Sequence, residues 1–224
     1  MLGVVACASA DVPEPSPELP EEPAPVPVLP PPAAVFEAEV QMLTQERISQ
    51  MRATSWRAGC PTPLADLRLL RVRHWDFEDQ LQWGELVLHV DAADAVQGAF
   101  KAAFDTHFAI RGVRPVSDFE GSDDLSMGAD NTSAFNCRMV KGTSSWSAHS
   151  SGSAIDINPR ENPWVKGGVF DPPEGDAFAN RQAPGKGKLR ADSALTLAFV
   201  HAGWGWGGNW TRLKDYQHFS KSGK

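Results

Sequence analysis

Residues 147–159, SAHSSGSAIDINP, contain a histidine and an aspartate that could hold a metal ion together. His149 and Asp156 are seven residues apart, and only small residues separate them before Ile155. Ile155-Asp156-Ile157 alternates apolar and charged residues, which is typical of a half-buried strand. We expect the isoleucines to point into the core and Asp156 to point away from it. A strand carboxylate beside a histidine on a tight loop predicts a metal site, provided that the rest of the chain supplies another ligand.

The other histidines are the candidates for that ligand: His74, His89, His107, His201 and His218. His218 differs from the rest in its neighbours, because it follows Asp215 by three residues and a turn rich in glycine and tryptophan, GWGWGGNW, precedes both. Each of the others is more often structural when taken alone. His107, for example, ends a predicted helix, where an imidazolium is ordinary.

Both halves of this pattern, in this order, resemble the D-alanyl-D-alanine carboxypeptidase and L-alanyl-D-glutamate endopeptidase family of zinc peptidases, which act on the peptides of bacterial peptidoglycan. The family pattern is Ser-x-His-x-x-Gly-x-Ala-x-Asp, followed at a distance by Asp/Glu-x-x-His. All of its positions are present in this chain, as Ser147, His149, Gly152, Ala154, Asp156, Asp215 and His218. The family also has an arginine upstream of the first histidine, and the chain offers Arg138. We expect the similarity to extend from about Thr54 to the end.

The resemblance implies that His149, Asp156 and His218 bind Zn²⁺ and leave the fourth position to water, as a catalytic zinc site requires. Asp215 would take a proton from that water as general base and return it to the departing amine as general acid. Arg138 would stabilise the negative charge that develops on the scissile carbonyl oxygen.

Two further expectations concern the surroundings of these residues. Ser147 would support the site by hydrogen bonding. Residues three apart on a regular strand face opposite sides, so Asp215 and His218 can share one pocket only if a bulge or turn lies at residues 216–217. Five tryptophans crowd the same region and could line a substrate cleft or belong to the core: Trp146, Trp164, Trp204, Trp206 and Trp210.

The function that we expect is hydrolysis of peptidoglycan stem peptides. The sequence leaves open whether the chain removes the terminal D-alanine or cuts between L-alanine and D-glutamate. A non-catalytic domain that binds the cell wall and retains the fold is the alternative, and it would predict the loss of a ligand or of the base. A lipoprotein that serves mainly as a scaffold is a third interpretation, and it needs a partner that the sequence does not name.

The charge of the chain is concentrated at its start. The net charge is −7, and residues 1–34 contain five acidic residues and no basic one, so the remainder is near −2. This balance argues against binding to nucleic acid through phosphates, because such proteins are basic. No apolar run is long enough to span a bilayer.

The first residues carry a pattern that predicts export. Val-Val-Ala-Cys, ending at Cys7, resembles the end of a bacterial lipoprotein signal, but only six residues precede the cysteine. Either the true start lies upstream or the pattern is chance. Ten prolines between residues 11 and 34 predict a semi-rigid spacer or a disordered tail. We expect an exported monomer at the cell surface or outside the cell, with a membrane tether through Cys7.

Two other cysteines, Cys60 and Cys137, lie within the predicted domain. We expect them to form a disulfide, which would stabilise the fold by about 4 kcal/mol. Two buried free thiols are the alternative. A zinc site made of cysteines is not expected, because the chain has no Cys-x-x-Cys pair.

The pattern of apolar residues predicts a helix over residues 35–55 that leads into a catalytic domain over residues 54–224. Within the domain we expect strands at 83–90, 110–119, 154–158 and 215–219, helices at 91–108 and 192–202, and long loops at 118–136 and 159–188. This order favours an α+β fold with a small antiparallel sheet and flanking helices. The resemblance further implies the hedgehog and D-Ala-D-Ala peptidase type of fold, with the zinc site on the sheet.

Overall fold

The structure, a computed structural model, describes residues 34–223, of which residues 35–223 belong to one compact unit. The predicted lipidation at Cys7 and the predicted proline-rich spacer lie outside the described residues. Among the helices of the described part, none has the length and apolar character that crossing a membrane requires.

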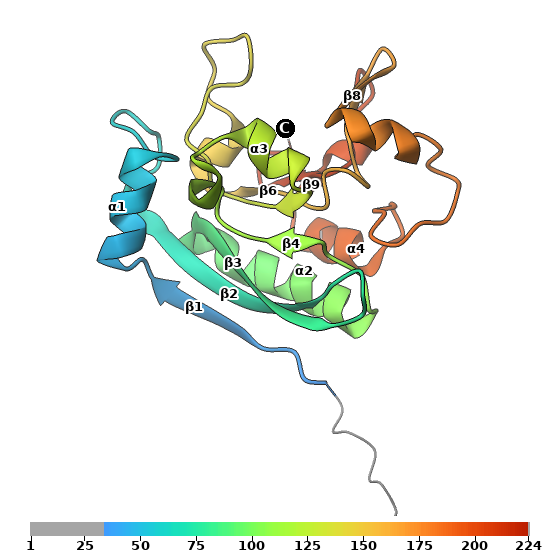
Figure 1. Cartoon of the computed structure of the whole chain (residues 1–224), viewed down its shortest axis with the longest axis horizontal. Helices are drawn as coiled ribbons and strands as arrows, with labels where there is room; N and C mark the ends of the chain where they lie inside the picture. The colour runs from blue at the N-terminus through green and yellow to red at the C-terminus, as the bar shows by residue number, and fades with distance from the viewer. Residues whose placement is uncertain (1–33, 224) are drawn as a thin grey trace, which may run out of the picture. The chain divides into compact units, whose positions relative to one another are not determined.

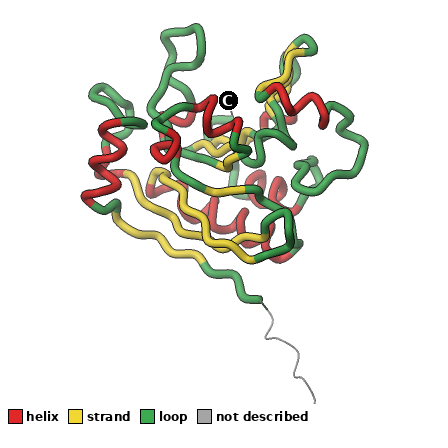
Figure 2. Tube along the Cα trace, in the orientation of Figure 1, coloured by secondary structure: helices red, strands yellow, loops and turns green. Residues whose placement is uncertain are grey.

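The described residues form three small antiparallel sheets and one parallel strand pair, with helices between them (Figures 1 and 2). The first sheet has the order β1-β2-β3, with β1 Ala38–Met42, β2 Leu67–Trp75 and β3 Leu81–His89. The second has the order β10-β7-β8, with β10 Lys214–Asp215, β7 Trp164–Lys166 and β8 Val169–Asp171. The third has the order β6-β11-β9, with β6 Ala154–Asp156, β11 His218–Ser220 and β9 Gly205–Trp206. The parallel pair joins β4 Gly112–Val113 to β5 Asn131–Thr132.

Four α-helices accompany these strands, α1 Gln45–Ala53, α2 Ala93–Asp105, α3 Asp123–Gly128 and α4 Ala194–His201. Short 3₁₀ helices connect the elements, namely η1 Leu64–Asp66, η2 Val90–Ala92, η3 Val116–Phe119, η4 Ala148–Ser151, η5 Pro173–Phe178 and η6 Gly207–Asn209. The mixed α and β composition confirms the coarse fold class that the sequence predicts. The single sheet of the prediction is wrong, because the strands divide among several short sheets.

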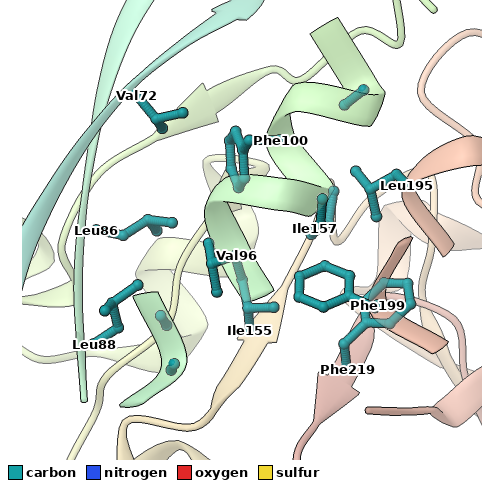
Figure 3. Close-up of a cluster of buried hydrophobic side chains, with 14 of the residues drawn as sticks. Val72, Leu86, Leu88, Val96, Phe100, Ile155, Ile157, Leu195, Phe199 and Phe219 are labelled. Carbon is teal, nitrogen blue, oxygen red and sulfur yellow. The ribbon is translucent and has the colours of Figure 1, made fainter. Parts of the chain in front are cut away.

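The main core lies around α2 (Figure 3). Val96 and Phe100 of α2 belong to one buried cluster with leucines of β2 and β3 and with Phe199 of α4. Ile155 and Ile157 are fully buried in this cluster, as the alternation around Asp156 predicts. They anchor both sides of the aspartate, so its position is fixed by apolar burial.

The helix predicted for residues 35–55 is wrong in its first half. Residues Ala38–Met42 form β1, an edge strand paired with β2, and only Gln45–Ala53 is helical. The helix begins where Thr44 caps it, since the Thr44 side chain accepts a hydrogen bond from the Arg47 backbone. Met51 of α1 is fully buried against strand residues of a second core cluster. This segment is therefore part of the folded unit and does not merely lead into it.

Other predicted elements differ mainly in length. The strand at residues 83–90 and the helices at 91–108 and 192–202 are present as β3, α2 and α4. The strand predicted for 110–119 shortens to β4, because Pro115 and the 3₁₀ helix η3 follow it. The loop predicted for 159–188 contains the β7–β8 hairpin and η5. The two strands of the hairpin are short and lack a clear alternating pattern of burial.

The predicted disulfide between Cys60 and Cys137 is present, with a Cα–Cα distance of 6.0 Å. It joins the segment after α1 to the segment that carries Arg138. The Arg57 side chain donates two hydrogen bonds to the Cys137 carbonyl, at 2.6 and 3.0 Å. The backbone next to Arg138 is thus held by a covalent bond and by a charged donor.

Candidate metal centre and catalytic site

The predicted metal ligands come from three neighbouring elements. His149 lies in η4, Asp156 ends β6 and His218 begins β11. Asp156 and His218 are directly paired across the antiparallel strands β6 and β11, which puts their side chains on the same face. The η4 turn brings His149 to that face.

The three side chains converge on one point. His149 Nε2 is 3.0 Å from Asp156 Oδ2, His218 Nδ1 is 2.9 Å from Asp156 Oδ1, and the two nitrogens are 3.3 Å apart. One donor atom from each residue lies within 4.8 Å of the others, and all three residues are buried. Because neighbouring elements cover the face of β6 opposite the isoleucines, Asp156 is only 8 % exposed. The prediction that it points away from the isoleucines holds, but it does not point into solvent.

The local backbone fixes the orientation of His149. Its Nδ1 is 2.6 Å from the Ala134 carbonyl, to which it donates, so Nε2 is directed at the other two ligands. Ser147 begins η4, and its side-chain oxygen accepts a hydrogen bond from the His149 backbone at 3.3 Å. Gly152 ends η4 with φ +67°, and a Cβ there would lie 2.6 Å from the His89 nitrogen. Both the backbone conformation and the close approach therefore require glycine at 152.

The carboxylate of Asp156 dominates the electrostatics of the cluster. Burial alone would raise its pKa, but His149 and His218 outweigh that effect and hold the pKa of Asp156 well below its usual range. Conversely, burial lowers the pKa of His149, and the charge of Asp156 outweighs it, so the pKa of His149 is raised. An ionised carboxylate between two imidazoles is an arrangement suited to a divalent cation.

Asp215 lies at the end of β10, and residues 216–217 form a bend between it and β11. The predicted irregularity is therefore confirmed, since Asp215 and His218 belong to different sheets. Burial raises the pKa of Asp215 to about 7, with His218 opposing the shift. Its Oδ1 atom is buried and has no hydrogen-bond partner among the described residues. A buried oxygen of this kind requires a hydrogen-bond donor, which a substrate or a water molecule would supply.

The glycine-tryptophan turn supports this bend. The Trp206 indole donates a hydrogen bond to the Tyr216 carbonyl at 2.8 Å. A Cβ on Gly207 would lie 2.4 Å from the Asp215 carbonyl oxygen, so only glycine allows the turn to pack against Asp215. The Arg181 guanidinium lies 4.3 Å from the ring centre of Tyr216.

Arg138 is held by an acidic residue that the sequence did not single out. Its Nη2 atom is 2.6 Å from Asp123 Oδ2, at the start of α3. The charge of Arg138 acts on the pKa of both His149 and Asp215, so the guanidinium lies within electrostatic range of the centre. Sequence reasoning missed Asp123 because residues 118–136 appeared only as a polar loop without a motif.

Three of the five tryptophans contribute to the cores. Trp204 and Trp206 are buried in the main core, and Trp146 packs against the second core cluster. Trp210 is half-buried with its ring 5.6 Å from that of His218, and Trp164 is half-buried on β7. The latter two are near the centre.

The other histidines lie outside the cluster. His74 is buried on β2, which agrees with a structural role. His107 stacks on Trp75 at 4.2 Å, His89 accepts a hydrogen bond from the Asp91 backbone, and His201 is exposed at the end of α4.

The donor set fits a catalytic metal. Two imidazole nitrogens and one carboxylate oxygen are ligands that zinc prefers, and three protein ligands leave a position open. Within the part of the chain that the structure describes, this is the one group of three or more such residues close enough to share an ion.

Comparison with known families agrees with the residues at the centre. A family model described as D-alanyl-D-alanine carboxypeptidase matches residues 141–221. This segment contains His149, Asp156, Asp215 and His218, and the match confirms the family resemblance. It is shorter than the similarity predicted from Thr54 onward, and Arg138 lies outside it. No curated protein and no solved structure matches the chain.

Proposed function

We propose that this chain, whose residues 141–221 match the D-alanyl-D-alanine carboxypeptidase family, is a zinc-dependent peptidase that hydrolyses the stem peptides of bacterial peptidoglycan. The observation that carries the proposal is the buried convergence of His149, Asp156 and His218 inside the matched segment. The presence of Asp215 beside them supports catalysis, because a binding domain would not need a base. We also propose that the whole domain has the hedgehog and D-Ala-D-Ala peptidase type of fold.

The chain's own residues would divide the chemistry among them. When bound, zinc supplies Lewis acidity that lowers the pKa of water toward about 7. Asp215 takes the proton of the attacking water on its carboxylate and gives it to the amine as the peptide bond breaks. Arg138 donates hydrogen bonds to the carbonyl oxygen as negative charge develops there. Asp123 keeps the guanidinium in place for that contact.

Removal of a terminal D-alanine and cleavage between L-alanine and D-glutamate both use these residues in the same roles. The proposal therefore covers both reactions. The masses of the products identify the bond.

We further propose that the enzyme is exported, acts as a monomer at the cell surface or outside the cell, and is tethered through Cys7. The Cys60–Cys137 disulfide supports export, because such bonds persist in oxidising compartments. Fractionation of cells that produce the full-length protein tests the tether. The wild type is expected in the membrane fraction, and Cys7→Ser should release it; membrane attachment of the variant would contradict the tether.

The activity is tested by measuring metal content and hydrolysis of purified stem peptides in the same preparation. The wild type is expected to hold one zinc per chain and to make one defined cut. Asp215→Ala should retain zinc and lose most activity, whereas His218→Ala should lose both. Full activity of Asp215→Ala would show that the base is misassigned. Zinc without cleavage in the wild type would instead favour a wall-binding domain.

A further inference from the structure

Three side chains form a row on one face of the β10-β7-β8 sheet. Asp215 of β10 is directly paired with Trp164 of β7, and Trp164 is directly paired with Asp171 of β8. Residues paired in this way in antiparallel strands project from the same face. Neighbouring strands are about 4.8 Å apart, so Asp171 lies about 10 Å from Asp215, with Trp164 between them.

Both ends of the row lie within electrostatic range of the same two charged residues. The charges of Arg138 and Asp123 act on Asp171, and the same two charges act on Asp215. In Figure 1, the β7–β8 hairpin and the long loop between β5 and β6 project on the same side of the molecule as α3. Asp171 is half-buried and therefore open to a bound peptide on that side.

Two acidic residues of α3 on this side are each paired with a cation. Asp123 pairs with Arg138 at 2.6 Å, and Asp124 pairs with Lys141 at 3.8 Å. Among the described residues, no cation lies within ion-pair distance of the Asp171 carboxylate, although the more distant Lys141 acts on its pKa. This carboxylate is therefore not held in an ion pair and can accept a cationic group of a ligand.

A second acceptor lies next to Asp171. Gln217, between Asp215 and His218, is only 2 % exposed, and its Nε2 is 3.4 Å from the Asp171 carbonyl oxygen. Its Oε1 atom is buried and has no hydrogen-bond partner in the described part of the chain. The Asp171 carboxylate and the unpaired Gln217 Oε1 are both hydrogen-bond acceptors. Together they suit a ligand group that has several N–H donors.

We propose that Asp171, Gln217 and the indole of Trp164 form a subsite for an ammonium group of the substrate peptide. The inference rests on the proposed function, since Asp215 marks where the bond is cut. The span of about 10 Å equals about three residues of extended chain. This span from Asp215 to Asp171 can be reached by a side-chain amine on a residue about two positions from the scissile bond. It can also be reached by a free N-terminal amine slightly farther along the peptide. A lysine ammonium supplies three donors, which the carboxylate and the amide oxygen accept.

The test uses the synthetic peptide L-Ala-γ-D-Glu-L-Lys-D-Ala-D-Ala in three forms: unmodified, acetylated at the lysine side chain, and acetylated at the N-terminus. Asp171→Asn removes the charge at the subsite and keeps the shape of the side chain. Asp176→Asn is the matched control, because Asp176 is exposed in η5 and carries the same charge a few residues away. We expect Asp171→Asn to lower kcat/KM on the unmodified peptide about tenfold, mainly through KM, and Asp176→Asn to leave it unchanged.

Acetylation identifies which amine is bound. Blocking that amine should lower kcat/KM of the wild type about as much as Asp171→Asn does, and should have no further effect on the variant. Sensitivity to lysine acetylation assigns the subsite to the side chain, and sensitivity to N-terminal acetylation assigns it to the chain end.

The remaining outcomes overturn the inference in distinguishable ways. An equal loss in Asp171→Asn on all three peptides would refute the subsite and leave the proposed function intact. Loss of zinc by this variant would also refute it, because the effect would then be structural. If the wild type cleaves none of the three peptides, the proposed function fails and the subsite fails with it.

Discussion

Replacing Glu161 with glutamine is predicted to change how the stability of this protein depends on pH. Glu161 is 3 % exposed and lies beside Asp130, which is 1 % exposed. Asp130 Oδ1 accepts a hydrogen bond from the Arg160 backbone at 2.8 Å, but Asp130 Oδ2 and Glu161 Oε2 have no hydrogen-bond partner among the described residues. Burial, reinforced by Asp130, raises the pKa of Glu161 to about 8, although the charge of Arg111 opposes the shift.

The sign of the effect follows from the two states of Glu161. In the unfolded chain it ionises near its ordinary pKa of 4.5, and in the folded protein near 8. Below pH 4.5 it is protonated in both states and contributes nothing to the pH dependence. Between pH 4.5 and about pH 8, Glu161 is ionised in the unfolded chain and still protonated in the folded protein. The free energy of unfolding therefore falls as the pH rises, by at most about 1.4 kcal/mol per pH unit. Glutamine cannot ionise, and the variant should be a few kcal/mol more stable than the wild type at about pH 8.

Urea unfolding followed by tryptophan fluorescence, at fixed zinc between about pH 5 and pH 8, measures this difference. Comparing the variant with the wild type at each pH cancels the contributions of the titrating groups that do not interact with Glu161, the metal ligands included. Glu174→Gln is the control, because Glu174 is exposed in η5 and should follow the wild type. A stability difference between Glu161→Gln and the wild type that stays constant across the range would refute the reasoning.

The remaining predictions concern the scaffold around the centre. The double variant Cys60→Ser/Cys137→Ser should lower the free energy of unfolding by about 4 kcal/mol, because the disulfide closes a long loop in the unfolded chain; an unchanged urea midpoint would contradict this. Gly152→Ala should reduce both stability and zinc content, because a Cβ there meets the His89 backbone and moves η4. Gly142→Ala is its control, since Gly142 has φ +77° and open space around it. Gly142→Ala should lower the free energy of unfolding by about 1–2 kcal/mol and leave the zinc content unchanged. Equal zinc loss in both variants would refute the argument.

The sequence by itself determined the candidates for the centre and part of their local geometry. Small residues between His149 and Asp156 predicted a tight turn, and the alternation around Asp156 predicted a strand anchored by isoleucines. The family resemblance implies that Asp215 and His218 share a pocket, and their three-residue spacing then predicted the bend between them. These inferences succeed because they depend on backbone periodicity and on residues close in the chain.

Only the tertiary structure decided which distant residues meet at the centre. The ion pair between Asp123 and Arg138 joins residues from different elements, and no spacing rule predicts it. The row from Asp215 through Trp164 to Asp171 depends on strand register in a sheet whose strands are very short. Register is set by long-range pairing and side-chain packing, and a shift of one residue would turn every side chain of a strand to the opposite face. The sequence therefore identified the groups for the chemistry, and the fold decided what surrounds them.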